Sequence, residues 1–314
     1  MSTYRTAPPQ LADAVFLTDG GIETTLIFDD GFDLPDFAAF VLLDRPDGRA
    51  ALERYFAAYA AVAERERVGI VLETATWRAS SDWGDRLGYS AQRLAAANHD
   101  AVQMLERIRA RYESASTPVV ISGCVGPRGD GYDAGVMAPE EARDYHRPQI
   151  DAFARSAADL VTAITMTNPS EAAGIALAAR DARMPVVISF TVETDGALPT
   201  GDSLRSAIEV VDAATNSHPA YYMINCAHPT HFAAVLDSDE AWMRRIRGVR
   251  ANASKLSHAE LDEASELDTG DPEELAAAYA ELRRRQPQIT VLGGCCGTNH
   301  DHVAAIGHAC AVRA

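Results

Sequence analysis

The chain has 314 residues and a formal net charge of −17. Its length suits one barrel-sized domain or two ordinary domains, and its acidity argues against a broad nucleic-acid-binding face. It contains no run of 18 apolar residues, so we expect no membrane span. The N-terminus, MSTYRTAPPQLADAVF, lacks the basic start and apolar core of a signal peptide, which favours a cytoplasmic protein. Five cysteines in a chain this long form no disulfide framework, so we expect reduced thiols.

Eight short apolar runs alternate along the chain with longer amphipathic stretches. Most of these runs are nearly continuous, which is typical of strands buried on both faces of a parallel sheet. The predicted strands are residues 15–21, 68–76, 118–127, 159–168, 185–193, 220–229, 246–254 and 289–297.

Helical patterns fill the intervals between the predicted strands. Apolar residues at helical spacing predict a helix over residues 90–113. A later helix is predicted to begin with Asp271 as its N-cap and Pro272 at its first position. Residues 139–157 are also helical in pattern, although Pro148 is expected to kink that helix.

Eight strand–helix alternations favour one (β/α)8 barrel over residues 1–314. A doubly wound dinucleotide-binding sheet would need a Gly-x-Gly-x-x-Gly turn after its first strand, and TDGGIETT does not supply one. Active sites of such barrels lie at the C-terminal ends of the strands. Polar and unusual residues gather at those predicted ends: Asp19, Gly20, Gly21, Glu73, Thr74, Cys124, Asn168, Glu193, Asn225, Cys226, Asn252, Cys295 and Cys296.

Three cysteines follow the sixth and eighth predicted strands, where a closed barrel would bring their side chains together. Soft thiolates select zinc, and three protein ligands leave a fourth coordination position open. Three thiolates around Zn²⁺ leave a formal charge of −1, which makes the ion a poor Lewis acid for splitting water. Such an ion still lowers the pKa of an incoming thiol. The ligand set Cys226, Cys295 and Cys296 therefore favours alkyl transfer to a thiol over hydrolysis.

Other interpretations of these residues remain open at this point. The GGCC sequence alone could be a tight turn that buries two thiols. Cys124 could be a further ligand or a packing residue, and Cys310 is expected to be a core thiol of the last helix. Histidines near the cysteines form a rival ligand set, although each is more typical of a loop or helix start: His228, His231, His300 and His302.

Three motifs resemble the homocysteine S-methyltransferase family, which includes the betaine–homocysteine and S-methylmethionine–homocysteine enzymes. They are TDGG after the first strand, INC after the sixth and GGCCGT after the eighth, and the resemblance covers nearly the whole chain. It implies a zinc-dependent (β/α)8 barrel that moves a methyl group from an onium donor to homocysteine, giving methionine. It also implies that Cys226, Cys295 and Cys296 are the zinc ligands.

The resemblance further implies a substrate pocket at the same end of the barrel. Acidic side chains and the aromatic residues Trp77, Trp83 and Tyr132 could attract the cationic donor. The residues expected to bind substrate are Asp19, Gly20, Gly21, Glu23, Glu73, Thr74, Glu193 and Asn225.

The chain departs from the family pattern at the end of the fourth strand. The family commonly has a glutamate there, which would pair with the ammonium group of the substrate. Here the segment AITMTNPSEA places Ile164 or Thr165 at that position, leaving Asp19, Glu23 or Glu193 to hold the cation. Residues 127–137 also look like an elaborated loop that could specialise the pocket.

Three alternatives to homocysteine methylation follow. The same chemistry could act on another thiol or selenol, or use an unusual onium donor, as the missing acid suggests. A non-catalytic zinc-binding barrel is the second alternative, and a zinc hydrolase, which would need histidine or carboxylate ligands, is the third. A homo-oligomer is compatible with the sequence.

Overall fold

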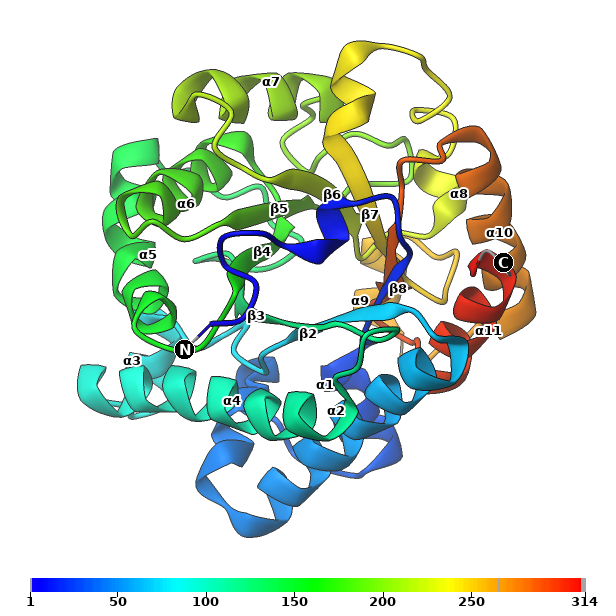
Figure 1. Ribbon diagram of the computed structural model, residues 1–314. Coiled ribbons are helices and arrows are strands. Elements are labelled where there is room, and N and C mark those ends of the chain that lie inside the picture. Colours follow the sequence, from blue (N-terminus) through cyan, green and yellow to red (C-terminus); the bar gives the residue numbers. More distant parts are fainter. Residues whose placement is uncertain (1, 265, 312–314) are drawn as a thin grey trace.

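The computed structural model describes residues 2–264 and 266–311, which form a closed barrel of eight parallel strands (Figure 1). Strands adjacent in the chain are adjacent in the barrel, and β1 closes it by pairing with β8. The predicted (β/α)8 barrel is confirmed. The strands are β1 (Phe16–Thr18), β2 (Gly69–Glu73), β3 (Val119–Val125), β4 (Leu160–Met166), β5 (Val186–Phe190), β6 (Tyr221–Asn225), β7 (Ile246–Ala251) and β8 (Val291–Gly294).

Each strand lies within the apolar run that was predicted for it. Every strand residue is buried except Arg247, which is half-buried. This burial follows from the layers around the sheet, because one face of each strand points into the barrel and the other is covered by helices. Continuous apolar runs, not alternating ones, were therefore the correct sequence signal.

Helices surround the barrel in Figure 1 and connect successive strands. Among the described residues, no helix is both long and apolar enough to cross a membrane. The α-helices are α1 (Ile22–Thr24), α2 (Pro46–Glu66), α3 (Ser81–Arg86), α4 (Ala91–Tyr112), α5 (Pro139–Ala154), α6 (Pro169–Asp181), α7 (Leu204–Thr215), α8 (Pro229–Phe232), α9 (His258–Glu263), α10 (Pro272–Arg285) and α11 (His300–Cys310). Shorter 3₁₀ or π segments are η1 (Pro9–Leu11), η2 (Thr25–Asp29), η3 (Pro35–Phe37), η4 (Ala39–Asp44) and η5 (Ala241–Arg245).

Helix starts follow the predicted capping chemistry. The side chain of Asp271 accepts hydrogen bonds from the backbone N–H groups of Glu273 and Glu274 at the start of α10, as an N-cap should. Pro272 occupies the first turn, where its missing N–H costs nothing. Helix α5 continues through Pro148 over its whole length.

The core has two parts. A large cluster fills the space between the sheet and the surrounding helices, and a smaller one fills the N-terminal half of the barrel interior. The side chains of the smaller cluster belong to Phe16, Val71, Val120, Leu160, Val187, Tyr221, Met223 and Val291. The lower barrel is thus a packed core, and space for a ligand is left only towards the C-terminal ends of the strands.

The N-terminal segment closes the lower end of the barrel, and it crosses the barrel opening in Figure 1. The backbone N–H groups of Thr3 and Tyr4 each donate to Asp159 Oδ1 at 2.8 Å. Asp159 also pairs with Arg109, and both side chains are at most one-tenth exposed. This buried ion pair fixes the segment far from the open end of the barrel.

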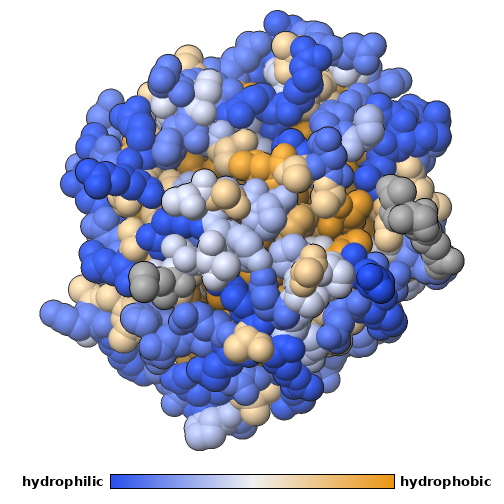
Figure 2. Space-filling view, in the orientation of Figure 1, coloured by the Kyte–Doolittle hydropathy of each residue, from blue (hydrophilic) through white to orange (hydrophobic). Residues whose placement is uncertain are grey.

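Three long segments stand above the C-terminal ends of the strands. They are residues 19–45 after β1, 126–138 after β3, and 252–264 with 266–271 before α10, and all three contribute to the walls of one cavity. Figure 2 shows the molecule in the orientation of Figure 1, where hydrophilic residues dominate the periphery and hydrophobic residues show nearer the centre.

Candidate metal and substrate site

A cavity of about 340 Å³ opens at the C-terminal ends of the strands. Residues at the ends of β1–β4 and β6–β8 line it. This is the end of a (β/α)8 barrel at which active sites lie. The lining includes most of the residues expected from the sequence: Asp19, Gly20, Gly21, Glu23, Glu73, Thr74, Cys226, Cys295 and Cys296.

Three sulfur atoms meet at one side of this cavity. Cys226 directly follows β6, and Cys295 and Cys296 directly follow β8, with β7 between them. Their Sγ atoms all lie within 4.8 Å of one another. Across residues 2–264 and 266–311, this is the one group of three or more histidine, cysteine or acidic side chains placed to hold a metal ion. The fold therefore brings together the three cysteines whose convergence was predicted.

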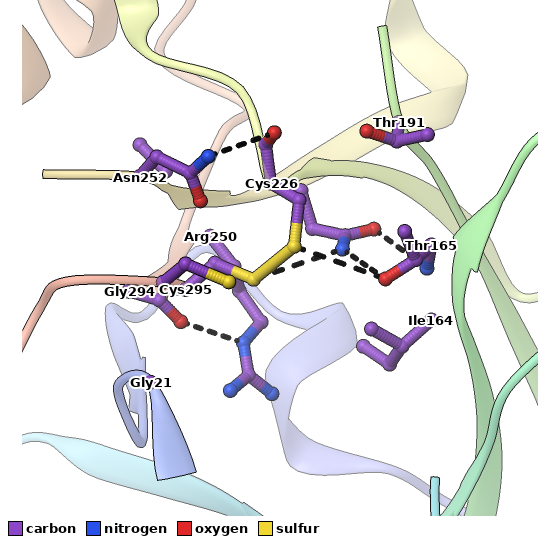
Figure 3. The surroundings of a disulfide bond; sticks show 12 residues. Gly21, Ile164, Thr165, Thr191, Cys226, Arg250, Asn252, Gly294 and Cys295 are labelled. Carbon is purple, nitrogen blue, oxygen red and sulfur yellow. Dashed lines mark hydrogen bonds between the residues drawn. A yellow bond between two sulfur atoms is a disulfide. The ribbon is translucent and has the colours of Figure 1, made fainter. Parts of the chain in front are cut away.

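Two of the three sulfurs are oxidised in this structure. Cys226 and Cys295 form a disulfide (Figure 3), while Cys124, Cys296 and Cys310 are free thiols. The expectation of reduced thiols throughout does not hold for this pair in this structure, where the barrel places their Cα atoms 5.4 Å apart, a separation that a disulfide can span. A disulfide offers no thiolate, so an external reductant such as a thiol must supply two electrons before both sulfurs can bind a metal.

The turn that carries Cys226 is held by its backbone. Its φ is 53°, a left-handed value that is uncommon for a residue with a side chain. Its N–H donates to the carbonyl of Arg250 at 3.1 Å. Its own carbonyl accepts from Asn252 Nδ2 at 3.0 Å, drawn in Figure 3, and from His258 Nε2 at 2.7 Å. These three bonds keep the Cys226 side chain directed at the cavity.

His258 connects this turn to the loop above the cavity. Its Nδ1 lies 3.1 Å from Glu193 Oε1, and its ring stacks on Tyr132 with the ring centroids 4.0 Å apart. The Tyr132 hydroxyl lies 3.9 Å from Cys296 Sγ. Glu193, expected to bind substrate, is thus placed against His258, behind the Cys226 turn.

Close packing explains the glycines before the cysteine pair. A Cβ atom on Gly293 would lie 1.8 Å from Thr18 Oγ1, and one on Gly294 would lie 1.9 Å from Thr298 Oγ1. No side chain fits at either position. Gly297 supplies the bend that was expected of these glycines, since its φ is 77°.

A buried arginine occupies the floor of the cavity between two carboxylates. Arg250 Nη2 lies 3.2 Å from Asp19 Oδ1, and its Nη1 lies 3.3 Å from Glu73 Oε2. All three side chains are less than one-tenth exposed. Its Nε donates to the carbonyl of Gly294 (Figure 3). Sequence reasoning missed Arg250, although an arginine inside the buried strand run IRGVRANAS is itself a signal.

The floor remains acidic despite this arginine. Burial raises the pKa of Asp19 and raises that of Glu73 to about 7, while Arg250 acts in the opposite direction on both. Burial disfavours the charge on Arg250, but Asp19 and Glu73 outweigh it and raise the pKa of the guanidinium. Burial likewise raises the pKa of Glu23 to about 7. The lining holds more carboxyl groups than guanidinium groups, and a cationic ligand beside them would favour their ionised forms.

Thr74 and Asn225 serve mainly to join strands. Thr74 Oγ1 accepts from the backbone N–H of Cys124 at 2.9 Å, which links the ends of β2 and β3. Asn225 is fully buried; its Oδ1 accepts from the N–H of Thr165 and its Nδ2 donates to the hydroxyl of the same residue. These bonds brace β6 against β4, directly below the sulfur atoms.

The rival histidines lie outside the group of three sulfurs. His228 is the N-cap of α8, and burial lowers its pKa to about 4. His302 completes a capping box with Asn299 at the start of α11. Cys124 lines the cavity but is not part of the sulfur group. The histidines of the rival set are His228, His231, His300 and His302.

The sequence profile described as "Homocysteine S-methyltransferase" matches residues 16–310. The chain belongs to this family. The resemblance carried by TDGG, INC and GGCCGT is therefore confirmed, and the match extends from β1 to α11.

Plant enzymes are among the relatives. Homocysteine S-methyltransferase 3 of Arabidopsis thaliana is 28% identical over 200 residues, which are 60% of this chain and 56% of that protein. Selenocysteine Se-methyltransferase of Brassica oleracea var. italica is 24% identical over 259 residues, or 75% and 73% of the two chains. The match thus spans little more than half of the Arabidopsis protein.

Solved structures of the homocysteine methyltransferase MmuM from Escherichia coli share the fold. The oxidized form superposes with a TM-score of 0.76 at 21% identity, covering 96% of this chain and 97% of that one. The metallated form gives a TM-score of 0.74 at 20% identity, covering 95% and 96%.

Proposed function

We propose that this chain is an S-methyltransferase that moves a methyl group from an onium donor to a thiol, with homocysteine as acceptor and methionine as product. The observation that carries the proposal is the meeting of three cysteine sulfurs within 4.8 Å at the wall of the cavity. Family membership supports the reaction class.

The donor set fits a zinc ion. Cys226, Cys295 and Cys296, once reduced, offer three soft ligands and leave one coordination position for a substrate. The E. coli neighbour has been solved in a metallated and an oxidized form, which parallels the metal-bound state proposed here and the disulfide of this structure. Zinc bound there would hold a substrate thiol as a thiolate, the form that is nucleophilic.

The residues around the sulfurs would then orient the two substrates. The sulfur of the acceptor attacks the methyl carbon as the bond from that carbon to the donor breaks, and the donor leaves as a neutral molecule. A cation and an anion thereby become two neutral products, so exclusion of water favours the transfer. Tyr132 above Cys296 helps to enclose the site, and the excess of Asp19, Glu23 and Glu73 over Arg250 attracts the cationic donor. In this scheme no side chain needs to act as a general base.

A donor-by-acceptor assay tests the proposal. Reduced, zinc-loaded protein would be incubated with S-methylmethionine or glycine betaine as donor and L-homocysteine as acceptor, and methionine would be quantified by mass spectrometry. We expect methionine to form with at least one donor. The same protein with the Cys226–Cys295 disulfide intact should form no methionine. If reduction of the disulfide does not increase methionine formation, the proposed ligands are contradicted.

A second acceptor class is favoured by one observation. Ile164 presents an apolar side chain where the cavity meets the end of β4. Methyl transfer to a selenol or to a thiol other than homocysteine would suit such a wall, and one relative is named a selenocysteine Se-methyltransferase. Strong turnover with homocysteine and weak turnover with selenocysteine in the same assay would reject this alternative.

His258 is expected to strengthen metal binding through the Cys226 turn. Replacing His258 with leucine removes the hydrogen bond to the Cys226 carbonyl and should weaken zinc affinity by about tenfold or more. Zinc affinity would be measured by competition with a chromophoric chelator. The matched control is His218→Leu, because His218 also bonds a backbone carbonyl, that of Met184, away from the site. Equal zinc affinities for the two variants would contradict the role given to His258.

A further inference from the structure

Most charged side chains inside the cavity are already committed to one another. Asp19 and Glu73 both face Arg250, as described above. At the end of β4, Ile164 is apolar and the Thr165 hydroxyl accepts a hydrogen bond from Asn225. The two floor carboxylates are therefore already paired with one arginine, and this wall presents no charge.

Arg78 is a buried cation with donors to spare. Its guanidinium carbon lies 4.0 Å from the ring centroid of Trp77 and 3.7 Å from that of Trp83, and its side chain is 4% exposed. Nη1 donates to the Gly129 carbonyl at 2.7 Å, but Nε is buried without a hydrogen-bond partner. Its ion pair with Asp130 is 3.5 Å long and that carboxylate is 61% exposed, so the pairing is weak.

Glu23 is an acidic group in the lining of the same cavity. It lies in α1, which follows β1, and lines the cavity. Among the described residues its carboxylate forms no ion pair, and the hydrogen bond it accepts comes from its own backbone N–H. Cys296 and Arg78 line the same cavity as Glu23. The ion-pair partner of Arg78 is Asp130, not Glu23.

We propose that Glu23 and Arg78 form a clamp for the α-amino and α-carboxylate groups of an amino-acid acceptor whose sulfur or selenium sits at the three cysteines. Glu23 would accept hydrogen bonds from the ammonium, and Arg78 would donate to the carboxylate. The two Trp rings pack against the guanidinium and hold it in place at the cavity wall. The proposal rests on the proposed function only in assigning the sulfur end to the three cysteines.

The clamp predicts a pattern across three thiols that differ only in their charged groups. L-homocysteine has both groups, 3-aminopropane-1-thiol has the ammonium alone, and 4-sulfanylbutanoic acid has the carboxylate alone. Binding to reduced, zinc-loaded protein would be measured by calorimetry without any methyl donor. Glu23→Gln should weaken the two ammonium-bearing thiols by about tenfold or more and leave the acid unchanged. Arg78→Gln should weaken the two carboxylate-bearing thiols to a similar extent and leave the amine unchanged.

A matched control separates recognition from packing. Arg86 also stacks on Trp83, at 4.7 Å, but it is 60% exposed and outside the cavity lining. Arg86→Gln should leave the binding of all three thiols unchanged. Equal losses for all three thiols in Glu23→Gln or Arg78→Gln, or no loss in either, would overturn the clamp. If wild-type protein binds the thiols in the expected order but methylates none of them, the clamp stands and the proposed methyl transfer fails.

Discussion

Replacing Cys226 with alanine should remove zinc from the protein and lower methyl transfer by about a thousandfold or more. The reason is the ligand count, since a reactive zinc site of this kind uses three protein ligands and the variant keeps only Cys295 and Cys296. Zinc would be measured by elemental analysis after reduction, loading and dialysis. The barrel should remain folded, because Cys226 contributes backbone bonds that alanine can also make.

Cys310 provides the matched control for this variant. It is a buried thiol in α11, 4% exposed, and lies outside the three-sulfur group. Cys310→Ala should keep the zinc content of the wild type.

The oxidised wild type should show three reactive thiols after unfolding without reductant, and Cys226→Ala should show four, since Cys295 loses its partner. Undiminished zinc in Cys226→Ala would refute the ligand assignment.

The strands and the sulfur group were predictable for related reasons. A strand buried on both faces must be apolar along its length, so each run was visible in the sequence alone. Residues that directly follow parallel strands meet at one end of the barrel. Counting the predicted strands was therefore enough to predict that Cys226 lies close to Cys295 and Cys296. The order of the elements was enough in both cases.

Pairings between side chains on distant strands were not predictable in this way. Arg250 lies between Asp19 and Glu73 because β7, β1 and β2 aim these side chains at the same interior point, and no local pattern encodes that distance. Glu193 lies in the loop after β5, which ends at Phe190, and a histidine from α9 holds it outside the cavity lining. The oxidation state of Cys226 and Cys295 depends on redox conditions as well as on geometry.

The second large effect is expected from Arg250→Met, which should lower the free energy of unfolding by about 3 to 5 kcal/mol near neutral pH. The substitution keeps an apolar stem of similar length but leaves Asp19 and Glu73 buried without a cation. Urea unfolding followed by circular dichroism would measure the loss. Arg109→Met is the matched control, because it breaks the buried pair with Asp159 at the closed end of the barrel. It should also destabilise the protein, yet leave zinc content and thiol binding unchanged.

The pH dependence gives this prediction a direction. Burial already raises the pKa of Glu73 to about 7 with Arg250 present, and without the arginine the folded-state pKa must rise further. The folded variant then binds more protons than the unfolded chain between about pH 4 and the raised folded-state pKa, so its stability falls as pH rises through that range. The loss in free energy of unfolding of Arg250→Met, relative to the wild type, should therefore be smaller at pH 5 than at pH 8. Adding Glu73→Gln should recover part of the loss at pH 8, because it removes one of the two unpaired charges. A deficit that is independent of pH, with no recovery in the double variant, would show that Arg250 stabilises the barrel by packing and not by charge.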